Sequence, residues 1–368
     1  MKNSNKLLIA LFFAALILPT LIFALVKDGV DTENHENREL ASFPDSSVHF
    51  ERWPAAFDGW YIDHLPFKNQ FTAANSLIQI ALFNTTTSPR VVVGEDGWLF
   101  YNNYDADDNP ISDILGQNEF TDAERETMLA NIEAAQSARP DTQFILLIAP
   151  NKETVYREML PEYIAENAVR QTRVEQLCDR LAERTDCLVW PEDALLEAAR
   201  TQQVYYKYDT HWNLIGGYIG VKEVCEKAGV TLPELSTLEI ADSGAVYPAD
   251  LAALAGIQAR STDDAEYSVV GFGEDVSVTR DELNFISPAT RFTSNASDER
   301  IVLFVHDSFY KSMEGYLPLV FSEVISVERN YYDLYGCHAL IEEFQPDIIL
   351  MEVAERGAVL LLHEDMPY

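Results

Sequence analysis

Three side chains of the types used in serine-based acyl transfer occur in two short motifs that lie far apart in the chain. The motif at 208–213 reads YDTHWN and contains Asp209 and His211, and the motif at 306–309 reads HDSF and contains Ser308. A hydroxyl nucleophile needs an imidazole to take its proton and a carboxylate to orient that imidazole. Asp209, His211 and Ser308 therefore predict a catalytic triad in the chain order Asp-His-Ser.

The sequence around Ser308 is typical of the end of a buried strand. An apolar run at 301–305 comes just before the serine motif, and a helix is predicted just after it. In open α/β sheets, ligands bind at this edge, and the start of a helix offers free backbone N–H groups. The amides of Ser308 and Phe309 are thus candidate donors to an oxyanion. The alternative is that Ser308 only caps the helix.

Asp209 and His211 lie in a predicted loop that opens a helix after Asn213. Two residues apart in an extended segment, their side chains emerge on the same side. His211 can then reach Ser308 while Asp209 approaches the other ring nitrogen. A metal site built from Asp209, His211, His306 and Asp307 is the alternative, but their spacing does not require one, and we predict neither a metal nor a cofactor.

The order of the predicted elements indicates an α/β fold with a largely parallel sheet. Thr121 and Glu124 form a capping box before an amphipathic helix. The continuous apolar run at 144–149 is typical of a strand that is buried on both faces of a parallel sheet. Further helices are predicted from Asn69, at 172–183 and at 213–228, further strands at 187–189, 301–305, 324–327 and 348–353, and a hairpin at 90–101.

The charge composition argues against one class of function, the binding of nucleic acids. The 368 residues carry a formal net charge of −34, which argues against binding a nucleic acid backbone. The acidic residues are spread along the chain, as on a solvated surface, although a surface suited to cationic partners is the alternative.

The uncharged segment 7–26, preceded by Lys2 and Lys6, is long enough to span a bilayer. We prefer an uncleaved anchor with the amino terminus in the cytoplasm, because no small-x-small cleavage site follows. A signal peptide is the alternative. Either interpretation places the rest of the chain outside the cytoplasm.

The expected division of the chain is an anchor at 1–27, a polar tether at 28–56 and a catalytic domain at 57–368. The segment 234–300 lacks clear periodicity and is predicted as an insertion or lid. In an extracytoplasmic location disulfides can persist, but the pairing of the cysteines cannot be read from sequence. The cysteines are Cys178, Cys187, Cys225 and Cys337. Cys178 and Cys225 fall within predicted helices, and the alternative for them is a small buried apolar side chain.

Several motifs together resemble the alginate O-acetylation protein family, the DHHW relatives of SGNH hydrolases. The matching residues are 60–67, 93–101, 149–153, 208–213, 307–309 and 352–356. The resemblance implies an SGNH-like three-layer sandwich, the triad Asp209, His211 and Ser308, and an O-acetyltransferase activity on polysaccharide. It also implies a partner, a polytopic membrane O-acyltransferase that exports acetyl groups. His306 stands where ordinary SGNH enzymes have glycine.

Other residues have both a functional and a structural interpretation. Trp212 is either a substrate platform or core, and Lys152 is either an electrostatic helper or, as we favour, a solvated loop lysine. Arg329 and Arg356 either bind an anionic sugar or, as we favour, pair with Glu352 and Glu355. Tyr332 either lines a sugar groove or packs in the fold.

The leading hypothesis is a single-pass membrane protein whose extracellular or periplasmic domain transfers acetyl groups to a cell-surface or exported polysaccharide. An acetylesterase with the same triad is the second hypothesis, because water and a sugar hydroxyl compete for the same acyl-enzyme. The third is a non-catalytic, glycan-binding scaffold for a membrane O-acyltransferase.

Overall fold

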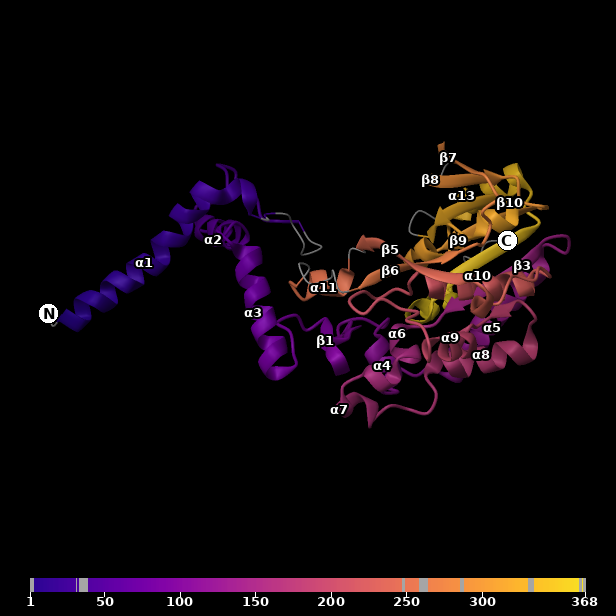
Figure 1. The fold of residues 1–368 in the computed structure, drawn as a ribbon, viewed down its shortest axis with the longest axis horizontal. Helices are drawn as coiled ribbons and strands as arrows, with labels where there is room; N and C mark the ends of the chain where they lie inside the picture. The colour runs from indigo at the N-terminus through magenta and orange to yellow at the C-terminus, as the bar shows by residue number, and fades with distance from the viewer. Residues whose placement is uncertain are drawn as a thin grey trace. The chain divides into compact units, whose positions relative to one another are not determined.

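The chain divides into two compact units in the computed structural model, which describes residues 3–30, 32, 39–246, 249–257, 264–284, 288–329, 334–363 and 366. Met1–Ser88 and Ala252–Arg260 form one unit, and Pro89–Leu251 and Ser261–Tyr368 form the other. Figure 1 labels the elements of both units.

The amino-terminal unit contains the helices α1 (Asn3–Val26), α2 (Trp53–Asp63) and α3 (Lys68–Phe83). The helical segment Asn5–Gly29 contains an 18-residue window with a mean hydropathy of 2.8 and is long and apolar enough to cross a membrane, as the sequence predicts. After α1, the rings of Phe43 and Trp60 pack edge to face, 4.9 Å apart, and the Asp63 carboxylate accepts the amide of Ala41 at 2.7 Å. These contacts hold the start of the unit's aromatic segment in place.

The second unit is built on a seven-stranded sheet with the order β4-β3-β11-β9-β10-β8-β7. The five strands from β4 to β10 are parallel, and β8 and β7 extend that edge in antiparallel fashion. This confirms the largely parallel sheet. The strands are β3 (Gln143–Ala149), β4 (Leu188–Val189), β7 (Val278–Asn284), β8 (Pro288–Ser294), β9 (Asp298–His306), β10 (Phe321–Glu328) and β11 (Ile348–Ala354).

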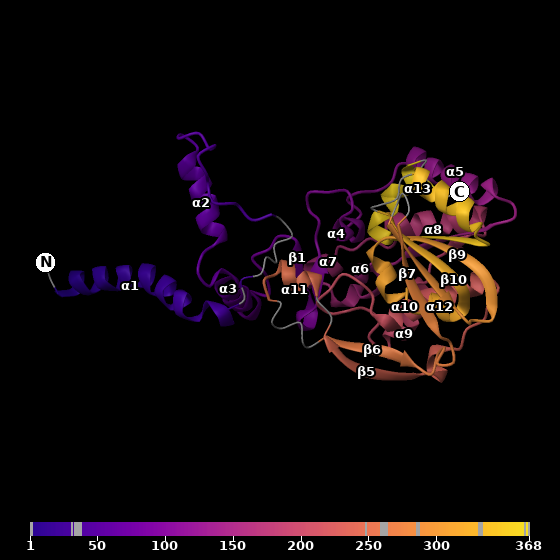
Figure 2. The ribbon, with the colours of Figure 1, turned by 90° about the horizontal axis from the view of Figure 1, so that it is seen from above.

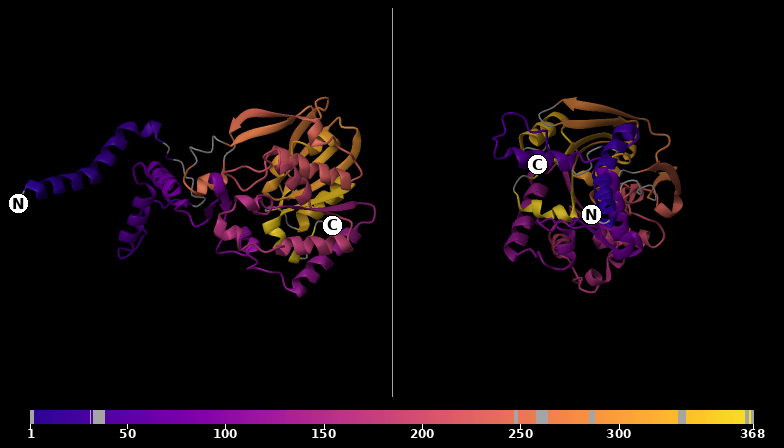
Figure 3. Two further views of the ribbon diagram at one scale, coloured as in Figure 1. Left: turned by 60° about the horizontal axis from the view of Figure 1, so that its bottom comes forward. Right: turned by 90° about the vertical axis from the view of Figure 1, so that its left-hand side faces the viewer.

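Helices cover both faces of this sheet, which gives the predicted three layers (Figure 2). Alternate side chains of β3 enter different cores, with Ile145 and Leu147 in one and Leu146 and Ile148 in the other. The first core includes α9 (Glu192–Ala199), α10 (Leu214–Lys227) and α12 (Leu317–Val320). The second includes α5 (Asp122–Ala138), α8 (Arg173–Arg184) and α13 (Leu334–Phe344), and Figure 3 shows the layers from two further sides.

Local sequence signals fix several element boundaries. Thr121 and Glu124 form the predicted capping box at the start of α5, and Thr172 begins α8 in the same way. The predicted hairpin at 90–101 is present as β1 (Val91–Val93) paired with β2 (Leu99–Tyr101). Four shorter helices also lie in the chain, namely α4 (Pro110–Ile114), α6 (Lys152–Val155), α7 (Glu162–Ala165) and α11 (Asp250–Leu254).

The segment 234–300 contains more regular structure than its sequence suggests. Here β5 (Glu239–Val246) pairs with β6 (Ala265–Val270), and β7 and β8 join the central sheet as its edge. Most side chains of β7 are exposed, so this edge strand shows no apolar alternation that sequence analysis could detect. A role of the segment as an insertion or lid stays a prediction.

All four cysteines are buried free thiols, which for Cys178 and Cys225 agrees with the alternative that they are small buried apolar side chains.

Helix α10 has a face made of glycines. A Cβ added at Gly217 would lie 2.1 Å from the carbonyl oxygen of Ser312, and one added at Gly220 would lie 2.8 Å from the Trp212 ring. Ser312 belongs to the 3-10 turn η6 (Ser308–Ser312), which begins with the predicted nucleophile. The missing side chains therefore allow η6 and the Trp212 loop to approach the helix backbone.

We expect Gly217→Ala to lower the free energy of unfolding by about 1–3 kcal/mol, because the new methyl group collides with backbone that cannot rotate away. Gly315→Ala is the matched control, since a Cβ there meets nothing within 4 Å. Denaturant unfolding followed by circular dichroism measures both variants. Equal stability of the two would contradict the close packing.

Candidate active site

The imidazole of His211 lies between the Ser308 hydroxyl and the Asp209 carboxylate. His211 Nε2 is 2.8 Å from Ser308 Oγ, and Nδ1 is 2.6 Å from Asp209 Oδ1. Ser308 follows β9 at the carboxyl edge of the sheet, whereas Asp209 and His211 come from the loop before α10. The His211 side chain is 11% exposed and Ser308 is half-buried. The structure thus brings the three predicted residues together.

The hydrogen bonds of Asp209 determine which ring nitrogen carries the proton. Burial alone would raise the pKa of Asp209, but bonds from the His211 ring and from the amides of Asp250 and His211 lower it. An ionised carboxylate only accepts hydrogen bonds, so His211 Nδ1 donates to Asp209. Nε2 is then free to accept the Ser308 O–H, as a general base requires.

The loop that carries Asp209 and His211 is closed at its base. Tyr205 and Trp212 form an antiparallel bridge, and the Asn213 amide donates to the Val204 carbonyl at 3.0 Å. The Asn213 side chain then caps α10 by accepting the amides of Ile215 and Gly216. The cap fixes the loop to the helix that follows it.

A buried lysine holds this loop from inside. Lys152 Nζ donates to the carbonyl oxygens of Tyr206, Lys207 and Asp209, at 3.2, 3.3 and 2.6 Å. Lys152 is 1% exposed, so the expectation of a solvated loop lysine is wrong. The position after a strand end suggested solvent, but the loop before α10 covers it.

Burial lowers the pKa of Lys152, while the carboxylates of Glu153, Asp250, Asp209 and Asp264 oppose this effect. The rings of Phe100 and Trp98 also lie 5.4 and 5.8 Å from the ammonium. The ammonium therefore acts as a fixed donor to loop carbonyls.

Acidic residues from the segment 234–300 bind the same loop through its amides and hydroxyls. Asp264 accepts the amides of Lys207 and Tyr208 at 2.9 and 2.7 Å. Asp250 accepts the amide and hydroxyl of Thr210 at 2.8 and 2.6 Å. Glu266 accepts the Tyr206 hydroxyl. No sequence signal pointed to these residues, because their segment has no detectable periodicity.

The turn that carries Ser308 is fixed by two acidic side chains. Asp307 accepts the amides of Phe309 and Ala354 at 2.9 and 2.7 Å, and its own amide donates to Glu352 at 3.0 Å. Burial, reinforced by Asp307, raises the pKa of Glu352 well above its usual value. The Phe309 amide is therefore engaged in this structure, whereas the Ser308 amide has no partner among the described residues. The Ser308 amide is the better oxyanion candidate.

Trp212 links the loop to the serine turn. Its indole is fully buried, and Nε1 donates to the Phe309 carbonyl at 2.9 Å. The Phe309 ring is also fully buried and lies 4.9 Å from the His211 ring. A fully buried indole offers no face to a substrate, so the core interpretation of Trp212 accounts for its position.

His306 is part of the strand end rather than of the reactive group. Its Nε2 lies 2.8 Å from Ser326 Oγ, and its ring stacks on Tyr310 at 3.8 Å. Burial lowers the pKa of His306 to about 4, which keeps the imidazole neutral at physiological pH. The side chain therefore packs and hydrogen-bonds at the end of β9.

The remaining predicted residues contribute less to the observed site. The Arg356 guanidinium lies 5.2 Å from the Phe309 ring and 5.9 Å from the Tyr101 ring. It forms no ion pair with Glu352 or Glu355 within the described part of the chain, although its charge opposes the rise in the pKa of Glu352. The pairing that we favoured stays a prediction. Arg329 is half-buried directly after β10, and Tyr332 lies outside the described residues.

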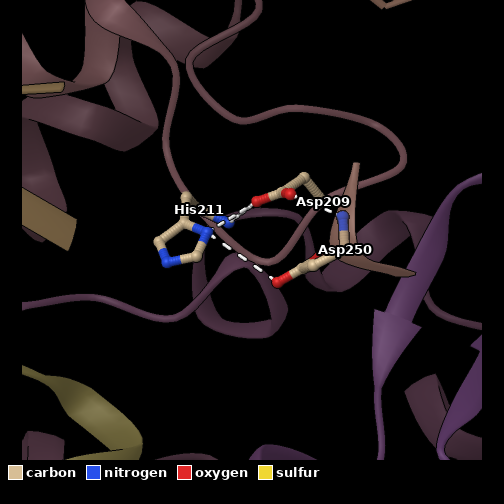
Figure 4. Close-up of side chains that lie close together, drawn as sticks. All are labelled: Asp209, His211 and Asp250. Carbon is tan, nitrogen blue, oxygen red and sulfur yellow. Dashed lines mark hydrogen bonds and ion pairs between the residues drawn. The ribbon is translucent and has the colours of Figure 1, made fainter. Parts of the chain in front are cut away.

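His211 belongs to a group of three potential metal ligands. Atoms of Asp209, His211 and Asp250 lie within 4.8 Å of one another, and Figure 4 shows both carboxylates on the same side of the ring. His306 and Asp307 are not in this group. Both Asp209 oxygens accept hydrogen bonds from N–H groups, so hydrogen bonding is enough to explain why these three side chains lie close together.

We expect Lys152→Met to slow the labelling of Ser308 by a serine-directed phosphonate at least about tenfold and to destabilise the fold by about 1–3 kcal/mol, because the buried carbonyls of Tyr206 and Asp209 lose this donor. Lys207→Met is the control, since Lys207 lies in the same loop but its ammonium contacts the Tyr208 ring. Labelling rates by mass spectrometry measure the effect. A solvated Lys152 would make the two variants alike.

A second prediction concerns Glu355, which is fully buried and accepts the Asn151 amide and the hydroxyls of Thr154 and Thr172. Burial raises the pKa of Glu355 to about 8. Between the unfolded pKa and this value the folded state holds a proton that the unfolded state releases, so raising the pH destabilises the fold.

We therefore expect the wild-type protein to lose roughly 3–5 kcal/mol more stability than Glu355→Gln when the pH rises from about 5 to 8. Unfolding curves across this range measure the difference, with the exposed Glu162→Gln as the control. Parallel pH dependence in all three proteins would contradict the buried neutral carboxyl.

One protein-family model matches part of this chain. The model of the SGNH hydrolase-like domain of the acetyltransferase AlgX matches residues 91–260, a little under half of the chain. This region contains Asp209 and His211, but it ends before Ser308. No curated protein matches the chain by sequence.

Two solved structures have a similar fold. A DHHW family protein from Eubacterium siraeum is 16% identical, with a TM-score of 0.54 over 73% of this chain and 91% of that chain. PatB1 from Bacillus cereus, solved with a sulfonyl adduct, is 12% identical, with a TM-score of 0.52 over 73% of this chain and 94% of that one. The family match confirms the resemblance that the motifs indicate and relates this chain to the SGNH hydrolase-like domain of the AlgX acetyltransferase family.

Proposed function

We propose that this protein is an O-acetyltransferase that moves an acetyl group to hydroxyls of a cell-surface or exported polysaccharide. The observation that carries the proposal is the His211 ring, 2.8 Å from Ser308 Oγ and 2.6 Å from Asp209 Oδ1. The match to an acetyltransferase family supports acetyl as the transferred group. The catalytic part would be residues 57–368, with the central sheet providing its reactive edge.

The proposed reaction has two half-reactions with the same groups. His211 Nε2 takes the Ser308 proton while Ser308 Oγ forms a bond to the acetyl carbon of the donor. The donor's ester bond then breaks, and its leaving oxygen takes the proton back from His211. In the second half, His211 deprotonates a sugar hydroxyl, which attacks the acetyl-serine and restores Ser308.

Two further groups support the charged states of this cycle. Asp209 holds the imidazole in the required tautomer and stabilises the imidazolium that forms. The Ser308 amide, at the start of η6, would donate to the oxyanion of the tetrahedral intermediate.

The location and the partner belong to the same proposal. Helix α1 is apolar and long enough to serve as a single-pass anchor, which would place the catalytic unit at the outer face of the membrane. A membrane O-acyltransferase that exports acetyl groups would supply the donor, and the acceptor would be a polysaccharide. The protein would need no nucleic acid partner.

We expect Ser308→Ala to lower acetyl transfer at least about a thousandfold while the fold stays intact, because the nucleophile is removed. The assay supplies p-nitrophenyl acetate to the purified full chain with and without an acceptor oligosaccharide, and mass spectrometry detects the acetylated sugar. Ser137→Ala, on an exposed position of α5, is the control.

The same assay separates the other candidate functions. Acetate release that is independent of the acceptor would indicate an esterase. Wild-type transfer by Ser308→Ala would overturn the assignment of the nucleophile. Glycan binding by a protein whose Ser308 does not react with a phosphonate would indicate a scaffold.

A further inference from the structure

We propose that Asp250 is a positioning residue that places a second carboxylate beside His211 and stabilises its protonated form. This inference rests on the proposed role of His211 as the general base. Asp250 is the first residue of α11, about forty positions beyond the histidine motif, and its segment showed no sequence signal.

The geometry joins Asp250 to the reactive group at three points. Its Oδ2 lies 3.8 Å from His211 Nδ1, and its amide donates to Asp209 Oδ2 at 2.7 Å. Its two carboxylate oxygens accept the amide and the hydroxyl of Thr210, at 2.8 and 2.6 Å. Figure 4 shows Asp209 and Asp250 approaching the same side of the imidazole. Asp250 is therefore fixed by Asp209 and Thr210, the two residues that precede the histidine.

This arrangement has an electrostatic consequence. Asp209 makes the short bond to Nδ1, and Asp250 adds a negative charge behind it that favours the imidazolium. The Asp250 side chain is 40% exposed, so solvent screens part of this effect. Partial burial and the neighbouring Asp209 raise the pKa of Asp250, and His211, Thr210 and Lys152 oppose this shift.

The other groups around the imidazole are few. Ser308 and the Phe309 ring come from η6, and the Thr210 hydroxyl lies 3.3 Å from Nδ1. The nearby cations are Lys152, whose Nζ donates to the Asp209 carbonyl, and Arg356, which lies over the Phe309 ring. Asp209 and Asp250 are the acids that form ion pairs with His211 in the described part of the chain.

Asp250→Asn tests the inference, because it removes the charge and keeps a side chain of the same shape. The full chain, with labelled histidine, is titrated by NMR, and the His211 signal is assigned by its loss in His211→Gln. We expect the midpoint of the His211 titration to move down by about 0.5–1 pH unit. The acid limb of the acetyl-transfer profile should move by the same amount.

Asp264→Asn is the matched control. Asp264 comes from the same segment and holds the same loop through the amides of Lys207 and Tyr208, but it forms no ion pair with His211 among the described residues. We expect this variant to leave the titration midpoint unchanged. Equal shifts in the two variants would mean that loop loosening is the cause, which would overturn the role of the charge.

Thr210→Val provides a second route if Asp250→Asn does not fold. It removes the hydroxyl that donates to Asp250 Oδ2 and leaves both carboxylates in the chain. A shift of the His211 midpoint by about 0.3 pH unit or more would support the inference, because a released carboxylate moves away from the ring. An unchanged midpoint in both Asp250→Asn and Thr210→Val would overturn it.

The titration does not depend on acetyl transfer, so the two proposals fail separately. If the His211 midpoint shifts in Asp250→Asn but the wild-type protein transfers no acetyl group, the role of Asp250 is supported and the acetyltransferase is rejected. A protein that transfers acetyl groups, but whose His211 titration midpoint is the same in Asp250→Asn, would support the acetyltransferase and reject the role of Asp250.

Discussion

The serine and histidine motifs are 97 residues apart in the chain, and they meet on a face of α10 that carries no side chains. Gly217 lets the backbone at Ser312 approach the helix, and Gly220 lets the Trp212 ring do the same. The Trp212 indole then donates to the Phe309 carbonyl, and Ser312 Oγ donates to the Trp212 carbonyl at 3.0 Å. The short distance from His211 to Ser308 depends on this close packing.

Charged side chains of both signs bind the backbone of the loop that carries His211. A buried ammonium, Lys152, binds the carbonyls of the histidine loop, while Asp250 and Asp264 bind its amides. The loop backbone is thereby held at both its donors and its acceptors, so few of its polar groups need water. Such a loop can keep an imidazole in one orientation without being a helix or a strand.

The sheet supplies the second half of the site through the ends of its parallel strands. Ser308 follows β9, Glu355 follows β11 and Lys152 follows β3, and these three strands are neighbours in the order β3-β11-β9. Parallel strands place their carboxyl ends at one edge, which is why residues from three distant segments lie together. Two buried acids, Glu352 within β11 and Glu355 directly after it, hold this edge in place, because Glu352 binds the Asp307 amide and Glu355 binds the Asn151 amide.

The amino-acid sequence by itself determined most helices and strands and the types of the reactive side chains. Capping residues at Thr121 and Thr172, the apolar run of β3 and the asparagine cap of α10 are local signals, so their helices and strands could be predicted. Asp209 and His211 were recognisable because their spacing fits one loop, and Ser308 because it follows a strand.

Tertiary structure alone decided the burial of Lys152, the engagement of the Phe309 amide by Asp307 and the approach of Asp250 to the imidazole. Each of these depends on segments that are distant in the chain, and a local pattern holds no information about which backbone group will lie opposite a side chain. Solvent exposure and hydrogen-bond partners are properties of the packed fold, so they follow from the three-dimensional arrangement and not from the order of residues.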